Sequence, residues 1–406
     1  MKEIIHLISE HQTIKDFSTG KVSFSHLSLT QEALLIAASY INQPRSMIIV
    51  KSNLYLAQQL FEKIQFWLDQ DVVLYPVEES LRVEAIAASP EMAVIKMDSL
   101  SRLNNEEHLV CVTHLGAALR YTPNPSYFQE NKLSLKTNQK IQLKELKEKL
   151  YKLGYQNTSR VDVPNTYAAR GGVVDVFPIN SNHPVRIEFF DDEIESIRHF
   201  DVSSQRTIET IESIFIQPCS DLLFSEEEIS ELEQKTQTLL DQERKHKSEE
   251  FMLELEENIQ NDLELIKKGI KENHFYRYRA LLSKSYRLVD YVNNPSVYLS
   301  TTEDCEEHER RLSEESLDYL VELNQNAQAL PQFGVFMRLT EFLTNTKRFD
   351  FRRFESKSAH SKLPFREIDV PDASLLQHAK DIKKISETKR VICCLKDTEI
   401  KLLIPM

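Results

Sequence analysis

The sequence predicts an α/β protein in which a domain built on a parallel sheet is followed by a domain rich in β-strands. Two observations lead to this prediction. Strand-like and helix-like segments alternate over residues 1–120, the pattern of parallel strands joined by helices. Residues 161–206 contain runs of Val, Ile and Phe separated by Pro, Asn and Asp, the pattern of successive strands.

Residues 1–120 are predicted to form a first α/β domain. Three apolar runs indicate strands, at Ser46–Val50, Val72–Pro76 and His108–Thr113. Ser28 or Thr30 is expected to cap a helix over Gln31–Ile41, and Asn53 precedes a second helix with apolar residues at helical spacing. A further helical segment, Val83–Leu103, is expected to break at Ser89-Pro90.

Residues 121–218 are predicted to form a second domain of mixed helix and strand. A helix over Ile141–Leu153 should end at Gly154, a suitable residue just beyond a helix. Three strands are expected next, at Ala168–Phe177, Val185–Phe190 and Glu193–Phe200. Gly171-Gly172 within the first of them indicates a bulge or a close approach of another backbone segment.

The alternation of residues in Val185–Phe190 indicates a surface with a role in binding. Val185, Ile187 and Phe189 should share one face, and Arg186, Glu188 and Phe190 the other. A large aromatic beside an arginine on a charged face is typical of a protein-binding surface. Packing of Phe190 under a neighbouring loop is the alternative.

The composition argues against nucleic-acid wrapping and against a membrane protein. The 406 residues carry a net charge of −13, the opposite of what phosphate binding requires. No apolar run approaches the roughly 18 residues of a membrane span. The five cysteines are scattered and lack a CxxC pair, so reduced thiols in a cytoplasmic protein are expected. A local excess of ten Lys/Arg over six Asp/Glu between residues 121 and 190, next to five acids in 191–201, suits a charged protein partner.

The scarcity of glycine excludes a phosphate-binding loop. Such a loop needs two glycines about five residues apart, followed by Lys and Ser or Thr. Gly20 is the one glycine among the first 115 residues, and the residues after it do not fit. We therefore expect no nucleotide, no other cofactor and no catalytic residue.

Residues 219–345 are predicted to be largely helical and acidic. Their charge run is interpreted as a solvated helix face. A short strand is expected at Val297–Ser300, followed by a cluster of acidic residues between Glu303 and Glu309. A second ligand group at defined spacing is missing, so we expect no metal site in this cluster.

The second domain resembles a known family. Its segments RGGVVDVFP, PVRIEFFDDEIESIRHFD and SQRTIE are similar to domain 2 of the bacterial transcription-repair coupling factor, Mfd, which also occurs in the excision-repair protein UvrB. The resemblance implies that this domain docks onto the damage-recognition protein UvrA. It also implies that Arg170, Arg186 and Phe190 carry much of the contact.

The resemblance extends to the remaining segments. IIVKSNLYLAQQLFEKI, VVLYP and LVCVTHLGAALR resemble the opening domain of Mfd, a degenerate helicase-like domain of the P-loop type that lacks the P-loop. The fold implied is this parallel-sheet domain with an inserted mixed α+β UvrA-binding domain. Residues 219–345 would continue the first domain. Residues 346–406 would form a linker and the start of a further α/β domain, with a strand at Val391–Leu395 and with Cys393-Cys394 as core residues, so that the chain looks truncated before the RNA-polymerase-binding and motor domains.

The resemblance thus predicts a binding module rather than an enzyme. UvrA would be its direct partner in transcription-coupled nucleotide excision repair, and RNA polymerase and DNA would be partners of a full-length protein. One alternative is a piece of an ATP-dependent DNA translocase, which GxxxxGK[ST] and DExH-type motifs after Met406 would reveal. Another is a stand-alone competitor for UvrA or a nonfunctional remnant, which expression level and capture of UvrA would distinguish.

Overall fold

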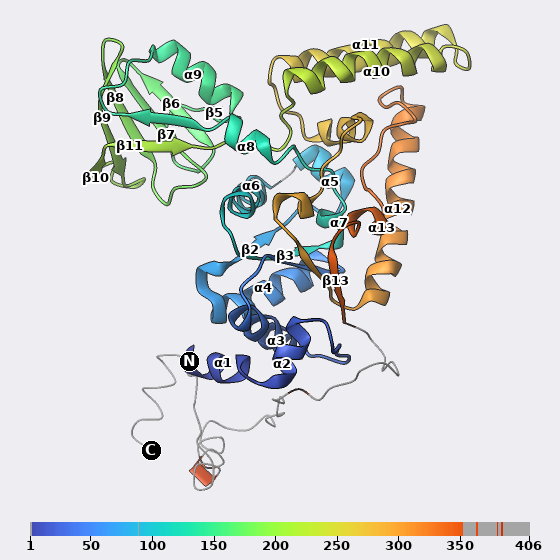
Figure 1. Cartoon of the computed structure of the whole chain (residues 1–406). Coiled ribbons are helices and arrows are strands. Elements are labelled where there is room, and N and C mark those ends of the chain that lie inside the picture. Colours follow the sequence, from blue (N-terminus) through green and yellow to red (C-terminus); the bar gives the residue numbers. More distant parts are fainter. Residues whose placement is uncertain (1, 88, 352–362, 364–379, 381–382, 385–406) are drawn as a thin grey trace. The chain divides into compact units, whose positions relative to one another are not determined.

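The computed structural model describes residues 2–87 and 89–351, together with residues 363, 380, 383 and 384 (Figure 1). All helices and strands named below lie within Met1–Pro364, which forms one compact unit. Within the described residues, no helix has both the length and the apolar character needed to cross a membrane.

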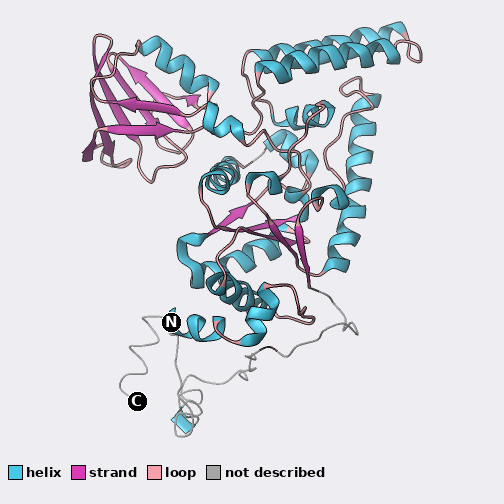
Figure 2. Ribbon diagram, viewed as in Figure 1, coloured by secondary structure: helices cyan, strands magenta, loops and turns pink. Residues whose placement is uncertain are grey.

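A five-stranded parallel sheet forms the centre of the first domain (Figure 2). Its strands in spatial order are β13 (Lys347–Asp350), β12 (Ser296–Leu299), β1 (Met47–Lys51), β3 (Val110–His114) and β2 (Val72–Tyr75). Every residue of β1, β2, β3 and β12 is buried, as expected for a parallel sheet covered on both faces. The three strands predicted for residues 1–120 are confirmed.

Helices preceding and following β1 cover this sheet. They are α1 (Lys2–Ser9), α2 (Gln12–Ser18), α3 (Leu29–Asn42) and α4 (Leu54–Leu68), and a 3-10 turn, η1 (Asp69–Asp71), leads into β2. Ser28 caps α3 through a hydrogen bond from the Gln31 backbone, and Asn53 caps α4 in the same way. Of the two predicted caps, Ser28 is therefore the one used. The helix α4 contacts β1, β2 and β3.

The segment between β2 and β3 is helical and broken at the predicted position. It forms α5 (Leu81–Ala87) and α6 (Pro90–Asn105), with Ser89 as the N-cap and Pro90 in the first turn of α6. Met97, Leu100 and Leu103 of α6 join the core that Ile48 and Val50 of β1 contribute to. The short α7 (Leu115–Ala118) follows β3 directly.

The second domain contains a six-stranded, mainly antiparallel sheet and a two-stranded ribbon. The sheet order is β10 (Thr207–Ile211), β9 (Glu193–Phe200), β8 (Val185–Phe190), β7 (Val173–Phe177), β6 (Thr166–Arg170) and β5 (Gln156–Asn157), and β4 (Leu133–Lys136) pairs with β11 (Ser213–Ile216). The helices are α8 (Ser126–Glu130) and α9 (Leu143–Lys152). Leu146 and Leu150 of α9 share a core with Val174 and Val176 of β7. Gly154 ends α9 with a φ of +103°, as predicted.

The predicted strand Ala168–Phe177 is wrong, because the chain reverses direction in its middle. Gly171, with a φ of +57°, and Gly172 form the turn between β6 and β7, which pair as an antiparallel hairpin. The expected close backbone approach does occur at Gly172. A Cβ there would lie 3.0 Å from the Phe189 carbonyl oxygen, and the Phe189 amide donates to the Gly172 carbonyl at 2.8 Å. The two glycines therefore make a tight turn against the end of β8.

Two long helices pack as an antiparallel hairpin after the second domain (Figure 1). They are α10 (Glu226–Glu243) and α11 (Glu249–Lys267), capped by Ser225 and Ser248, and the 3-10 segments η2 (Asn273–Leu281) and η3 (Leu288–Tyr291) follow. Leu232, Leu255 and Ile259 are fully buried, whereas most of the acidic side chains are exposed. The interpretation of this charge run as a solvated helix face is confirmed.

A buried carboxylate fastens the hairpin to η2. Asp262 accepts hydrogen bonds from Arg277 at 2.9 Å and from the Tyr278 hydroxyl at 2.7 Å, and His274 lies 3.1 Å away. Burial alone raises the pKa of Asp262, but the bonds from His274 and Tyr278 and the charge of Arg277 outweigh it and hold this pKa below its ordinary value. The network therefore favours the charged carboxylate.

The chain after η3 returns to the first sheet. It forms β12, then α12 (Thr302–Gln325), α13 (Leu339–Phe342) and β13. Lys347–Asp350 thus belong to the parallel sheet, whereas the sequence placed the start of a linker at residue 346. The predicted strand Val391–Leu395 and Cys393-Cys394 lie outside the described residues. Cys111, Cys219 and Cys305 are free, buried thiols.

Candidate protein-binding surface

The outer face of the six-stranded sheet carries the predicted binding residues. Val185 and Ile187 of β8 are fully buried, and Phe189 packs against the same core. Phe190 is 76% exposed. The predicted alternation along β8 is confirmed, and packing of Phe190 under a loop is excluded in this structure.

Strand pairing places the three predicted residues on one side of this sheet. Arg170 of β6 pairs with Val173 of β7, which pairs with Glu188 of β8. Paired residues point to the same face, so Arg170 and Glu188 share the outer face, and Arg186 and Phe190 follow two positions to either side of Glu188. With strands about 4.8 Å apart and about 6.8 Å per two residues, Arg170 and Phe190 are separated by roughly 12 Å at their Cα atoms.

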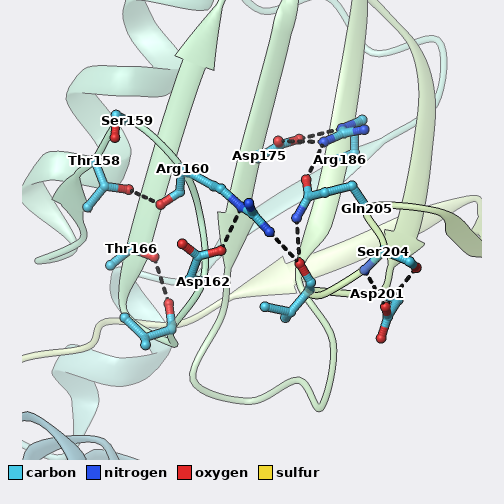
Figure 3. Close-up of polar contacts among 12 residues, drawn as sticks. Thr158, Ser159, Arg160, Asp162, Thr166, Asp175, Arg186, Asp201, Ser204 and Gln205 are labelled. Carbon is cyan, nitrogen blue, oxygen red and sulfur yellow. Dashed lines mark hydrogen bonds and ion pairs between the residues drawn. The ribbon is translucent and has the colours of Figure 1, made fainter.

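Arg186 is held by its neighbours and is not a free surface arginine (Figure 3). Its Nε and Nη2 donate to the two oxygens of Asp175 at 2.7 and 2.8 Å, and Nη2 also donates to Gln205 at 3.2 Å. Its guanidinium lies 4.6 Å from the centre of the Phe200 ring. The hydrogen bond to Asp175 raises the pKa of Arg186. Arg186 is therefore only partly exposed, because the carboxylate of Asp175 lies beside it on β7.

Arg170 differs from Arg186 in having no acidic partner. It is exposed at the end of β6, and its guanidinium donates to the Ser159 carbonyl. Among the described residues, no carboxylate lies within ion-pair distance of Arg170. By contrast, Arg198 on the same face pairs with Glu188. Arg170 thus supplies a positive charge that no carboxylate of this face pairs with.

A hollow of about 360 Å³ lies on this face beside Arg170. Arg170, Arg186 and Asp175 line it, together with Arg160 and Gln205 from the two loops at its rim. Arg160 pairs with Asp162 at 2.8 Å and donates to the Val202 carbonyl at 3.0 Å, which links these loops (Figure 3). Chemically, this arrangement can accept a carboxylate or a carbonyl from a partner.

Phe190 stands at the end of β8, beside an acidic turn. Asp191, with a φ of +57°, and Asp192 form the turn between β8 and β9. The Asp192 carbonyl accepts from the Ile141 amide at 2.8 Å, which fixes the turn against the start of α9. Residues 170–206 therefore present a basic hollow, an exposed ring and an acidic turn in sequence along one face.

Sequence reasoning missed Asp175, Arg160 and Gln205 as members of this surface. Asp175 could have been found, because an acid between Val174 and Val176 must face away from a buried side of the strand. Gln205 gave no signal, since its position depends on a loop conformation with a φ of +59°. Its side-chain amide donates to the Val202 carbonyl and its oxygen accepts from Arg186.

A second candidate ligand site lies at the carboxyl ends of β1 and β12. The helical connection after β1 leads to β2 on one side of the sheet, and the connection after β12 leads to β13 on the other side. Ligands of such sheets bind at this switch point. Here Lys51 of β1 and Glu32 of α3 form an ion pair of 2.9 Å, and the Ser300 hydroxyl after β12 bonds to both. The side chains of Lys51 and Glu32 are 6% and 5% exposed, so protein groups fill the crevice.

The acidic run from Glu303 to Glu309 lies on α12. Glu309 accepts from the Leu339 backbone at 2.8 Å, which ties α12 to α13. Across the part of the chain that the structure describes, no three His, Cys, Asp or Glu side chains are arranged to hold a metal ion.

Comparison with known protein families identifies the second domain. Residues 133–222 match the family model of the UvrB interaction domain. These residues include β4 to β11 and the whole surface described above. The chain is thus a protein that contains a UvrB interaction domain.

Curated proteins of known name match a longer part of the chain. The chain is 29% identical over 342 residues to the transcription-repair-coupling factor of Bacillus subtilis. The aligned region covers 83% of this chain and 29% of that protein. It is 27% identical over 358 residues to the factor of Staphylococcus epidermidis, covering 84% and 30%. Over most of its own length the chain is therefore similar to transcription-repair-coupling factors. It spans less than a third of the length of these curated relatives.

Proposed function

We propose that the chain recruits UvrA through the outer face of its UvrB interaction domain and acts in transcription-coupled nucleotide excision repair. The observation that carries the proposal is the 76% exposure of Phe190 on the same face as the unpaired Arg170, within a domain of this family. The mechanism would be mimicry, because the domain would present to UvrA the face that UvrB presents.

Phe190 and Arg170 suit the binding of UvrA for different physical reasons. An exposed phenylalanine is unfavourable in an unbound protein, and it releases a large apolar area from water when a partner covers it. An unpaired arginine can form a bidentate bond to a partner carboxylate without first breaking an internal ion pair. Arg186 contributes differently, because Asp175 and Gln205 already hold its guanidinium at the floor of the hollow.

Capture of UvrA by the purified chain tests this proposal. Immobilised chain should retain UvrA, and added UvrB should displace it because the two proteins compete for one surface. Retention of UvrA that UvrB cannot reduce would contradict mimicry, and failure to retain UvrA at micromolar concentration would contradict recruitment. A variant carrying both Arg170→Ala and Phe190→Ala serves as the negative control.

We further propose that the parallel-sheet domain is a degenerate helicase-like domain that binds no nucleotide. The support is the ion pair of Lys51 and Glu32 at the switch point, together with the lack of a glycine-rich phosphate loop in the sequence. A phosphate entering the crevice would have to displace Glu32 and would meet its negative charge. Calorimetric titration with ATP and magnesium should give no heat of binding. A dissociation constant below about 100 μM, or roughly 5.5 kcal/mol, would contradict the proposal.

The partners of the longer relatives belong to the same proposal. We infer that RNA polymerase and DNA are contacted in the cytoplasm by regions other than the surface described here. The chain would then serve as a binding module rather than as an enzyme. A measurable ATPase activity of the purified chain, stimulated by DNA, would favour the alternative that it takes part in translocation directly.

A further inference from the structure

A polar cavity of about 210 Å³ lies where three parts of the chain meet. Lys96 of α6 and Arg120 after α7 line it from the first domain. Asn165 and Asp221 line it from the second domain and its exit, and Lys271 and Tyr276 from the segment around η2. The cavity lies outside the outer sheet face and outside the switch-point crevice.

Arg120 is the central group of this cavity and is only partly satisfied. It is 6% exposed, and its guanidinium lies between the rings of Tyr276 and Phe336, 4.3 and 4.8 Å from their centres. One terminal nitrogen pairs with Glu84. Its Nε and its other terminal nitrogen are buried and have no hydrogen-bond partner. Buried donors without partners are rare in folded proteins, so an acceptor is expected beside them.

Other groups at the cavity also lack partners. The Tyr276 hydroxyl is buried beside the Arg120 guanidinium but makes no hydrogen bond of regular geometry with it, and the side-chain oxygen of Asn165 is buried without a partner. Exchange of the oxygen and nitrogen of the Asn165 amide would present two donors in place of that oxygen. Arg120, Tyr276 and Asn165 together can then donate to a single acceptor-rich group.

The charges around the cavity do not balance. Lys96 pairs with Asp221 at 2.8 Å, and Arg120 pairs with Glu84, so these four charges cancel. Lys271 remains, and it donates to the Gly154 carbonyl. Among the described residues, no carboxylate lies within ion-pair distance of Lys271, and burial lowers its pKa. One positive charge is therefore buried without an opposite charge.

We propose that this cavity binds a small oxyanion of the size of phosphate, held by Arg120, Lys271 and Tyr276. Water could accept the free hydrogen bonds of Arg120 but could not balance the charge of Lys271. An oxyanion does both, because it offers several acceptor oxygens and a negative charge. The bound ion would join the first domain, the exit of the UvrB interaction domain and η2, and so stabilise the junction between them.

Thermal unfolding with inorganic phosphate tests the proposal. Addition of about 10 mM phosphate to a phosphate-free buffer, at constant ionic strength, should raise the unfolding midpoint by about 2 °C, whereas chloride should not. Sulfate should act like phosphate because its oxygens have the same arrangement. Adenosine monophosphate should be tested in the same way. An equal rise of the unfolding midpoint would mean that phosphate esters also fit the cavity, and no rise would mean that the cavity takes the free ion.

Two variants and a control make the result specific. Tyr276→Phe removes the hydroxyl but keeps the ring beside Arg120, so the rise of the midpoint caused by phosphate, measured against the same variant without phosphate, should fall by half or more. Lys271→Met should abolish the effect. Lys268→Met removes an exposed charge nearby and should retain it. The proposal is overturned if phosphate does not stabilise the natural chain, or if Lys271→Met and Tyr276→Phe respond as strongly as Lys268→Met.

Discussion

Replacement of Lys51 by methionine should strongly destabilise the first domain. The Lys51 ammonium is the one cation within ion-pair distance of Glu32 among the described residues, and both side chains are almost fully buried. Lys51→Met keeps the length of the side chain but leaves the Glu32 carboxylate in a low-dielectric crevice with the Ser300 hydroxyl as its partner. Breaking a buried pair by removing one member costs about 3–5 kcal/mol, so we expect a loss of this size.

The double variant Glu32→Gln with Lys51→Met should recover much of this loss. It contains no buried charge, and the glutamine amide can still bond to Ser300. Replacing both members of a buried pair is often close to neutral, so a residual loss of about 1–2 kcal/mol is expected. The difference between the double variant and the sum of the single variants then measures the interaction of the pair.

Urea unfolding followed by circular dichroism provides the free energies. Lys144→Met, which removes an 86% exposed lysine, is the control and should change stability by less than about 1 kcal/mol. A loss below about 1 kcal/mol for Lys51→Met would refute the reasoning, because it would mean that Glu32 does not remain buried and charged. Equal losses for the single and double variants would show that packing rather than charge matters.

Three further predictions follow from other contacts. Arg186→Ala should lower the free energy of unfolding by about 2 kcal/mol in urea titrations, because it leaves the half-buried Asp175 unpaired and removes a cation–π contact, and a loss below 0.5 kcal/mol would contradict this. Because the pKa of Asp262 is lowered in the folded chain, its stabilisation is complete above about pH 4 and is lost as the pH falls through the folded pKa. Unfolding midpoints between pH 5 and 3 should therefore fall more steeply for the natural chain than for Asp262→Asn, and parallel curves would contradict this. Gly172→Ala should cost about 1–3 kcal/mol by calorimetry, since its Cβ would lie 3.0 Å from the Phe189 carbonyl, and an unchanged midpoint would show that the turn yields.

Local sequence patterns were sufficient to predict features that depend on a single strand or helix. The alternation along β8 predicted that Phe190 faces away from Val185 and Ile187, because successive side chains of a strand point to opposite faces. The buried strands β1, β2 and β3 were predicted from their continuous apolar runs. Gly154 was predicted to end α9 because a residue without a Cβ tolerates a positive φ.

Features that depend on distant segments could not be predicted. Asp175 lies eleven positions before Arg186, and only the pairing of β7 with β8 brings the two side chains together. Lys51 and Ser300 are 249 positions apart and meet because β12 returns beside β1. β13 adds to the same sheet after α12, and its short charged sequence gave no strand signal. Long-range pairing therefore determines which charged side chains are free for a partner.

The affinity of UvrA for the Phe190→Ala variant tests the central proposal most directly. Phe190 is exposed, so its removal should change the free energy of unfolding by less than about 1 kcal/mol. If the ring is a hot spot, the dissociation constant for UvrA should rise about thirtyfold, or roughly 2 kcal/mol. Phe66→Ala removes a 56% exposed phenylalanine outside the UvrB interaction domain and should leave the affinity unchanged. An affinity of the folded Phe190→Ala variant within twofold of the natural chain would contradict the proposed surface.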